Sequence, residues 1–198
     1  MDTDSRILFY IILNAQHLKQ LASCCTQCPI ALKKILILSD THNYLDSRIW
    51  RYVEECDQVW HAGDIGTIAI TDQLKKIKPL QAVYGNIDGQ DVRMVHPLIN
   101  RFRCEEVEVA MTHIGGYPPK YNSDLLKLLN ENVPDIFVCG HSHILKVMRD
   151  PTHHNMIFIN PGAAGVHGFH PIQTLIKIKI DGKRIFDLEV VELKRERV

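Results

Sequence analysis

The sequence predicts an α/β fold of two packed mixed β-sheets flanked by helices, a four-layer α-β-β-α sandwich. In the first half of the 198-residue chain, short apolar runs alternate with segments of helical periodicity, and in the second half strand-like segments predominate. The alternation is typical of parallel strands joined by right-handed crossovers, whose carboxyl ends meet along one edge of a sheet. α/β proteins bind ligands at that edge, so residues that directly follow strands are the first candidates for function.

The first half is predicted to form a β-α-β-α-β unit that starts near residue 34. Ile35–Leu38 is a short, fully apolar run that fits a buried strand. The runs and periodicities that follow predict, in order, a helix at Leu45–Val53, a strand at Val59–Trp60, a helix at about Thr67–Ile77 and a strand at Leu80–Tyr84. These strands are expected to lie parallel in one sheet.

The second half is predicted to contain one helix and mostly strands. The helix is expected near Ser123–Asn130, and the strands at Val107–Met111, Ile136–Cys139, Leu145–Met148, Met156–Ile159, Thr174–Ile180 and Ile185–Val191. Alternation of apolar and polar residues over 175–180 favours an antiparallel strand with one exposed face, and Asp181-Gly182 favours a hairpin turn after it.

Length and composition indicate one folded domain over residues 34–198, preceded by an N-terminal extension of unknown role at residues 1–33. Lysine and arginine together number 23, as do aspartate and glutamate, so no net charge attracts the chain to nucleic acid or to an anionic membrane. The longest apolar run, Ile7–Leu13, is too short to span a bilayer, and we expect a cytoplasmic protein. A homo-oligomer is compatible with the sequence.

The six cysteines do not form the disulfide pattern of a small secreted protein. Cys24, Cys25 and Cys28 form a C-C-x-x-C cluster that could bind zinc or act in redox chemistry, but the cluster lacks an adjacent fourth ligand. We interpret these residues as incidental thiols.

Five apolar runs end within two residues of a side chain that can bind a metal ion. These side chains are Asp40, Asp64, Asn86, His113 and His141. Gly63, Gly85 and Gly140 directly precede three of them and permit a tight turn or a close approach of backbones. If the runs are strands, their ends bring the five side chains to one place.

Two of these positions carry a second imidazole two residues on, His42 after Asp40 and His143 after His141. In an extended chain, side chains at this spacing point the same way, so each pair can face one cavity. The pooled set has two carboxylates, one amide and four imidazoles, which is too rich in nitrogen for calcium or magnesium and suits manganese, iron, cobalt, nickel or zinc. Seven ligands exceed the need of one such ion and fit two ions that share a bridging carboxylate.

The order of these motifs, D-x-H, G-D, G-N, a lone His and G-H-x-H, resembles that of the calcineurin-like metallophosphoesterase superfamily. Within it, Gly85-Asn86-Ile87-Asp88, Thr112-His113-Ile114-Gly115 and Asn160-Pro161-Gly162-Ala163 look most similar to the small YfcE-type phosphodiesterases. The resemblance covers about residues 34–192 and implies a sandwich with a dinuclear metal centre at the strand ends. It implies that Asp40, His42, Asp64 and His143 hold the first ion, and that Asp64, as the bridge, holds the second with Asn86, His113 and His141.

The implied activity is hydrolysis of a phosphoester, in the first place a phosphodiester, by in-line attack of a hydroxide that bridges the two ions. Manganese is the expected ion, with nickel, iron, zinc and cobalt as alternatives. The expected catalytic residues are Asn86, His113 and Asp88. Asp88 either orients Asn86 or a water molecule, or is a solvated residue of the turn.

At position 87 the chain departs from the larger members of the superfamily, whose Gly-Asn-His motif supplies an imidazole thought to stabilise the transition state or to protonate the leaving group. Ile87 cannot do this, and a general acid is worth about 10²-fold to 10⁴-fold in rate. We therefore expect a preference for diesters with good leaving groups. His61 could support the site or fill the core, His167 and His170 could reach phosphate, and the Gly115–Tyr121 loop could cover substrate or be an ordinary surface loop.

Two other functions stay open at this point. The protein could be a phosphomonoesterase or a nucleotide pyrophosphatase, because nothing in the sequence identifies the organic part of the substrate. It could also be a non-catalytic scaffold, like the retromer subunit that resembles this superfamily but has lost metal ligands; Ile87 favours this alternative and the intact ligand set opposes it. The expected partner is a small phosphoester or nucleotide-like substrate, with no stable binding to nucleic acid or a membrane.

Overall fold

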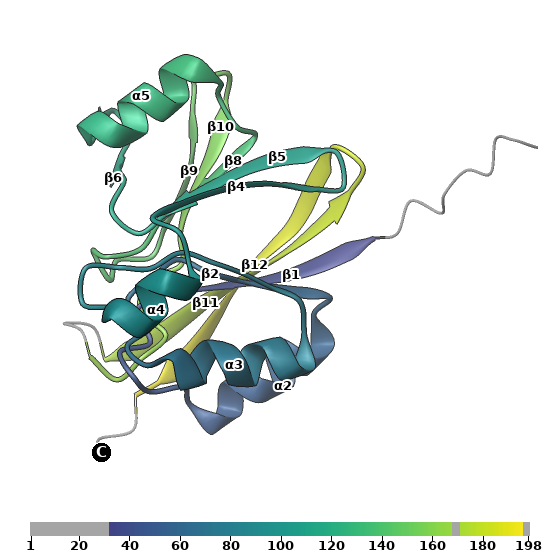
Figure 1. Ribbon diagram of the computed structural model, residues 1–198. Helices are drawn as coiled ribbons and strands as arrows, with labels where there is room; N and C mark the ends of the chain where they lie inside the picture. Colours follow the sequence, from purple (N-terminus) through teal and green to yellow (C-terminus); the bar gives the residue numbers. More distant parts are fainter. Residues whose placement is uncertain (1–31, 168–170, 196–198) are drawn as a thin grey trace, which may run out of the picture. The chain divides into compact units, whose positions relative to one another are not determined.

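Two five-stranded sheets face each other in the described part of the chain, residues 32–167 and 171–195 of the computed structural model (Figure 1). Helices cover the outer face of each sheet, so the predicted four-layer sandwich is confirmed. Of the predicted N-terminal extension only residues 32 and 33 are described. Cys24, Cys25, Cys28 and His170 also lie outside the described residues.

The first sheet has the strand order β12-β11-β1-β2-β3. β1 (Lys33–Leu38), β2 (Gln58–His61) and β3 (Leu80–Ala82) are parallel, and the antiparallel hairpin of β11 (Ile172–Asp181) and β12 (Arg184–Lys194) extends the sheet beyond β1. The register aligns Leu38 with His61 and His61 with Ala82, so the three parallel strands end side by side. The predicted β-α-β-α-β unit and the terminal hairpin are confirmed.

Helices α2 (Trp50–Glu55) and α3 (Ile68–Ile77) cover the first sheet (Figure 1). The prediction of one continuous helix at Leu45–Val53 was wrong, because Ser47–Ile49 forms a 3-10 turn, η1, that leads into α2. Asp46 sets this start. Its carboxylate accepts hydrogen bonds from the backbone N–H of Arg48 at 2.9 Å and from the Arg48 guanidinium at 2.6 Å, in the manner of a helix N-cap.

The second sheet has the strand order β4-β5-β8-β10-β9. The strands span Ile99–Cys104 (β4), Val107–Thr112 (β5), Ile136–Val138 (β8), Met156–Asn160 (β10) and Lys146–Asp150 (β9). β5, β8 and β10 are parallel, so this sheet also collects carboxyl ends at one edge. α5 (Ser123–Glu131) covers its outer face and packs Leu125 and Leu129 against Phe137 and Phe158.

β4, the helix α4 (Gln90–Val95) and the two-residue strands β6 (Gly116–Tyr117) and β7 (Lys120–Tyr121) were not predicted. β4 is an edge strand with exposed arginines at 101 and 103, so it has no continuous apolar run. α4 has six residues and buries only Val92, which is too little to establish a helical period. Each of the missed elements buries at most one apolar residue.

Apolar side chains from both sheets interlock between the layers. Ile37 of β1, Val109 of β5 and Ile159 of β10 belong to one buried cluster between the sheets. Full burial of such a side chain stabilises a fold by about 1.5–3 kcal/mol, so this layer fixes the distance between the two ligand-bearing edges. Among the described residues, no helix is long and apolar enough to cross a membrane.

Candidate metal centre

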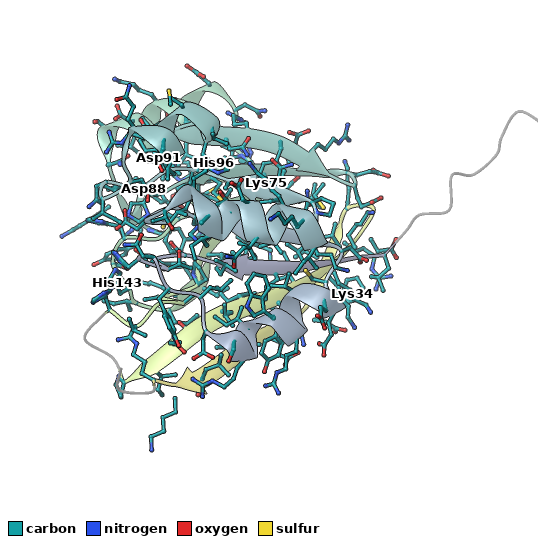
Figure 2. The ribbon with its side chains drawn as sticks, turned by 60° about the horizontal axis from the view of Figure 1, so that its bottom comes forward. Lys34, Lys75, Asp88, Asp91, His96 and His143 are labelled. Carbon is teal, nitrogen blue, oxygen red and sulfur yellow. The ribbon has the colours of Figure 1, made fainter. Side chains whose placement is uncertain are left out.

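The predicted ligands lie where the parallel strands of both sheets end. They follow β1 (Asp40 and His42), β2 (Asp64), β3 (Asn86), β5 (His113) and β8 (His141 and His143). Figure 2 shows Asp88 and His143 toward one side of the molecule, and Lys34, near the start of β1, toward the other. Backbone hydrogen bonds of 3.0 Å join the loops, from Asp40 N–H to the Gly63 carbonyl and from Gly140 N–H to the His113 carbonyl.

Asp40, His42 and His143 form the first group of candidate ligands. Nε2 of His143 lies 3.2 Å from Oδ1 of Asp40, and Nε2 of His42 lies 4.0 Å from the same oxygen. The two Nε2 atoms are 3.2 Å apart. One ion with bonds of about 2.0–2.2 Å can contact three atoms at such spacings.

Asp64, His113 and His141 form the second group. Nε2 of His113 lies 3.2 Å from Oδ1 of Asp64, and the His113 and His141 rings meet edge to face with centroids 5.3 Å apart. The other Asp64 oxygen, Oδ2, lies 3.9 Å from Nε2 of His42 in the first group. Asp64 therefore reaches both groups, which is the position that a bridging carboxylate requires.

Two buried atoms of the centre, Asp40 Oδ1 and His113 Nε2, have no hydrogen-bond partner among the described residues. A buried polar atom left in this state costs about 1–3 kcal/mol, so a bound group that satisfies it is expected. Nδ1 of His113 lies 2.8 Å from the carbonyl oxygen of Ala62, which can only accept. Nδ1 therefore carries the proton, and Nε2 presents its lone pair to the centre.

The charges of the centre shift the pKa values of its groups. Burial by itself lowers the pKa of His113, but the Asp64 and Asp40 carboxylates outweigh burial, and the pKa lies above its ordinary value. Burial raises the pKa of Asp64, but His113, the Ile87 backbone N–H and His42 together more than compensate, and this pKa lies below its ordinary value. The Asp64 carboxylate, kept ionised among imidazoles, makes the centre attractive to a cation.

Five of the seven predicted ligands have a left-handed backbone. They are Asp40, His42, Asp64, His141 and His143, with φ of 55°, 47°, 52°, 70° and 57°. Residues other than glycine adopt this conformation rarely, each at a cost of about 1–3 kcal/mol, and they cluster at functional sites. The expectation of extended chain in the two imidazole pairs was therefore wrong, because the chain turns sharply at each strand end. His141 and His143 consequently fall in different groups.

Gly85 and Gly140 let the ligand loops touch. A Cβ atom at Gly85 would overlap Oδ1 of Asp64, and one at Gly140 would overlap Oγ of Ser39 and crowd the Asp40 carboxylate. A side chain at either position would push the loops apart. The predicted close approach at these two glycines is thus confirmed.

Asp88 is buried and is not a solvated turn residue. Its Oδ1 accepts a hydrogen bond from Gly66 N–H at 2.6 Å, and its Oδ2 accepts one from Gly85 N–H at 2.7 Å. These bonds tie the loop that carries Asp64 to the loop that carries Asn86. Because both oxygens are engaged by backbone, the geometry favours a positioning role over contact with substrate.

Asn86 and Ile87 are both exposed at the edge of the centre. Asn86 lines a cavity together with His113, and its carbonyl accepts a hydrogen bond from the Arg93 guanidinium at 3.2 Å. The Ile87 side chain points no polar group at the centre, but its backbone N–H donates to Oδ1 of Asp64 at 3.1 Å. At position 87 the backbone, and not the side chain, contributes to the site.

His61 and Thr41 support the centre through a buried chain of hydrogen bonds. Gly63 N–H donates to Nδ1 of His61 at 3.2 Å, so Nε2 carries the proton and donates to Thr41 Oγ1 at 3.0 Å. The Thr41 hydroxyl donates to the carbonyl of Ile65 at 3.0 Å. Burial lowers the pKa of His61 to about 3, so the ring is neutral. Thr41 was not predicted, although it lies between two predicted ligands.

Two further residues border the centre. The His167 ring lies 5.7 Å from the His42 ring, close enough for the two to meet edge to face. The Asn160 amide donates to the carbonyl of Gly140 at 2.8 Å and to Oγ of Ser142 at 3.1 Å, and so holds the His141–His143 loop. Asn160 ends β10 and follows the same strand-end rule as the predicted ligands, which could have identified it.

Residues 34–183 match the profile of the calcineurin-like phosphoesterase superfamily domain. The chain belongs to this superfamily. A probable metallophosphoesterase of Methanothermobacter thermautotrophicus is 25% identical over 162 residues, which cover 78% of this chain and 90% of that protein. A probable metallophosphoesterase of Mycoplasma pneumoniae is 29% identical over 170 residues, covering 79% of this chain and 96% of the relative. The resemblance seen in the motifs is confirmed.

Solved structures with the same fold are named for different functions. A structure described as a novel archaeal phosphodiesterase has a TM-score of 0.62 at 21% identity, and the match covers 81% of this chain and 99% of that chain. Vacuolar protein sorting 29 of Cryptosporidium parvum has a TM-score of 0.63 at 17% identity, covering 83% and 99%. At these identities the likeness shows the fold alone, and function has to be argued from the site.

The donor set of this chain fits divalent metal ions, which the superfamily implies. Each group combines imidazole nitrogens with a carboxylate, and the set contains no thiolate. The unpartnered atoms Asp40 Oδ1 and His113 Nε2 are those that an ion would satisfy. The chain therefore has two candidate metal sites at the strand ends, joined through Asp64.

Proposed function

We propose that the protein is a dinuclear metal-dependent phosphodiesterase with manganese as its preferred ion. The observation that carries the proposal is the pair of ligand groups that Asp64 connects, with buried ligand atoms left unpartnered in both. The first ion would be held by Asp40, His42, Asp64 and His143, and the second by Asp64, Asn86, His113 and His141. When bound, two such ions lower the pKa of water and neutralise charge on the nonbridging phosphoryl oxygens.

The chain's own groups hold the ligands and orient the substrate. The Ala62 carbonyl fixes the tautomer of His113, so its Nε2 stays unprotonated toward the centre. Asn86, exposed beside His113, has an amide that can donate to a phosphoryl oxygen without adding negative charge. Asp88 accepts hydrogen bonds from the backbone of the Asp64 loop and of the Asn86 loop, and thereby positions Asn86 relative to Asp64.

We assign no residue of this site to protonate the leaving group. Hydrolysis forms a bond between phosphorus and a water oxygen and breaks the bond to the leaving oxygen, which takes up a proton or departs as an anion. Ile87 supplies no proton, and a general acid is typically worth about 10²-fold to 10⁴-fold. The rate should therefore depend steeply on the acidity of the leaving group, with 4-nitrophenyl esters much faster than alkyl esters.

The test uses metal-stripped protein to which manganese, nickel, zinc or magnesium is added in turn. Hydrolysis of bis(4-nitrophenyl) phosphate, of 4-nitrophenyl phosphate, of an alkyl phosphomonoester and of a pyrophosphate-linked nucleotide is measured beside a His113→Ala control. We expect turnover of the diester that requires metal, is highest with manganese and is lost in the control. Equal or better turnover of alkyl phosphomonoesters would contradict the diester preference and favour a phosphomonoesterase. Selective cleavage of pyrophosphate-linked nucleotides would favour a nucleotide pyrophosphatase.

A non-catalytic scaffold is the second candidate function, and two observations favour it. Ile87 lacks the imidazole of larger members, and the fold is shared with vacuolar protein sorting 29. Retention of two ions per chain without turnover of any phosphoester, under all four metals, would support the scaffold and refute the enzyme. The cytoplasmic location stays a prediction.

A further inference from the structure

Two cavities of about 340 Å³ each adjoin the candidate metal centre. One is lined by His113 and is called here the His113 cavity; the other is lined by His141 and is called the His141 cavity. Ile114 lines both and separates them. Because the His113 and His141 rings lie only 5.3 Å apart, both cavities adjoin the same second ligand group, and a phosphate bound at that group would lie near both.

The His141 cavity has large apolar walls. Tyr117 and Ile144 are 49% and 53% exposed, and the buried ring of Phe158 lies beneath them. The Lys146 ammonium lies 3.9 Å from the centroid of the Tyr117 ring, a cation–π contact that steadies the ring. Exposed apolar surface beside a charged centre is a mark of a binding site, and a steadied tyrosine favours an aromatic group that packs against it.

The His113 cavity is more polar and contains a guanidinium. Arg93 lies over the Tyr84 ring at 4.9 Å, donates from Nε to the Asp88 carbonyl at 2.7 Å and from Nη2 to the Asn86 carbonyl at 3.2 Å. These three contacts hold the guanidinium at the cavity wall. A group placed there meets donors as well as the apolar side chains of Leu98 and Ile99.

We propose that the substrate is a phosphodiester with two organic arms, of which an aromatic arm occupies the His141 cavity and the second arm occupies the His113 cavity. This inference rests on the proposed function and names the substrate class of the same site. A monoester has a single arm and leaves one cavity unfilled, so the two cavities account for a diester preference. Tyr117 is the specificity-determining residue for the aromatic arm.

Isoleucine methyl groups allow a direct binding test on zinc-loaded full-length protein, because zinc is diamagnetic. Ile99 lines only the His113 cavity, Ile144 only the His141 cavity, and Ile114 both, whereas Ile77 on α3 serves as the reference. Inorganic phosphate, phenyl phosphate and diphenyl phosphate are titrated while the ¹³C-methyl resonances are recorded. Phenyl phosphate should move Ile144 and Ile114, and diphenyl phosphate should move Ile99 as well. Diphenyl phosphate shifts no larger than those of inorganic phosphate would overturn the proposal.

Variants separate this inference from the proposed function. Tyr117→Ala should weaken binding of diphenyl phosphate about 5- to 10-fold and raise KM for bis(4-nitrophenyl) phosphate by a similar factor. Tyr117→Phe should restore both values. Met94 is an exposed apolar residue of α4 that lines neither cavity, so Met94→Ala should change neither value. Diester turnover that is indifferent to Tyr117→Ala would refute the cavity assignment and leave the phosphodiesterase standing. The expected shifts without turnover would refute the enzyme and leave the ligand site standing.

Discussion

Two buried aspartates beside histidines, Asp40 and Asp150, have opposite surroundings. Both oxygens of the Asp150 carboxylate accept hydrogen bonds from protein donors. Oδ1 accepts from Thr152 N–H at 2.9 Å and from Thr152 Oγ1 at 2.6 Å. Oδ2 accepts from the Tyr121 hydroxyl at 2.5 Å and from His153 Nδ1 at 2.8 Å. Among the described residues, the Asp40 carboxylate accepts one hydrogen bond, from His141 N–H to Oδ2 at 3.2 Å. Its Oδ1 has no partner among the described residues, although imidazole nitrogens surround it.

This difference distinguishes a structural carboxylate, Asp150, from a candidate metal ligand, Asp40. Burial alone raises the pKa of Asp150, but the hydrogen bonds from Thr152, Tyr121 and His153 outweigh burial, and the pKa lies below its ordinary value. That cluster ties the end of β7 to the turn between β9 and β10, and it needs nothing further. Asp40 is buried equally well, but its Oδ1 has no hydrogen-bond partner among the described residues, as expected of a carboxylate that binds a cation.

The largest expected contrast is between Asp40→Asn and Asp150→Asn. Saturating manganese at 100 times its dissociation constant stabilises a folded protein by about 2.7 kcal/mol per site, so it should raise the Tm of the wild type. Asp150→Asn should lose about 1–3 kcal/mol of unfolding free energy but keep the manganese-dependent rise. Asp40→Asn should weaken metal binding by more than about 100-fold, beyond the usual loss for a group that only supports a ligand. Calorimetry with and without manganese measures both; an unchanged metal response in Asp40→Asn would remove the contrast.

Thr41→Val should have the next largest effect, because it breaks the support of the Asp40 loop while keeping the side-chain volume. The variant loses the acceptor for His61 and the donor to the Ile65 carbonyl. We expect metal affinity to fall about 10-fold, in the range known for groups behind metal ligands. Isothermal titration with manganese measures this, and Thr41→Ser, which keeps the hydroxyl, is the matched control. Equal losses in Thr41→Val and Thr41→Ser would point to packing instead.

The buried imidazole of His61 predicts a pH dependence. Its pKa is about 3 in the folded protein and about 6.5 in an unfolded chain, so between these values the unfolded state binds the extra proton. The stabilisation is complete above pH 6.5 and is lost as the pH falls toward 3, by up to about 1.4 kcal/mol per pH unit. His61→Gln should show a shallower decline over this window in urea denaturation of metal-free protein. Parallel curves for the two proteins would contradict a neutral, buried His61.

The smallest expected effect is that of Tyr121→Phe, which removes one donor from Asp150 and leaves three. Unfolding free energy should fall by about 0.5–1.5 kcal/mol, the usual net contribution of one hydrogen bond, because three donors to the carboxylate remain, and metal affinity should not change. Chemical denaturation and manganese titration measure the two quantities. A loss of metal affinity here would show that the two aspartate clusters are coupled.

The candidate metal centre could be predicted from the sequence because its signals are local. Five of the seven predicted ligands follow an apolar run within two residues, and His42 and His143 lie two residues beyond two of these five. Glycine precedes Asp64, Asn86 and His141. The same rule applied to Asn160 would have added the residue that holds the His141–His143 loop. The Asp150 cluster has no such signal, since Tyr121 and Asp150 lie 29 positions apart and meet only through packing.

The sequence by itself determined the layer order, the parallel strands and the identity of the side chains at their ends, because apolar periodicity and strand-end chemistry are read from neighbours in the chain. The tertiary structure alone decided which imidazole faces which carboxylate, that Asp88 joins two loops through its oxygens, and that Ile114 divides two cavities. Those relations depend on sharp left-handed turns and on contacts across about 20 to more than 100 positions, such as the bond from His141 N–H to Asp40. Local sequence propensities do not encode contacts between residues that lie so far apart in the chain.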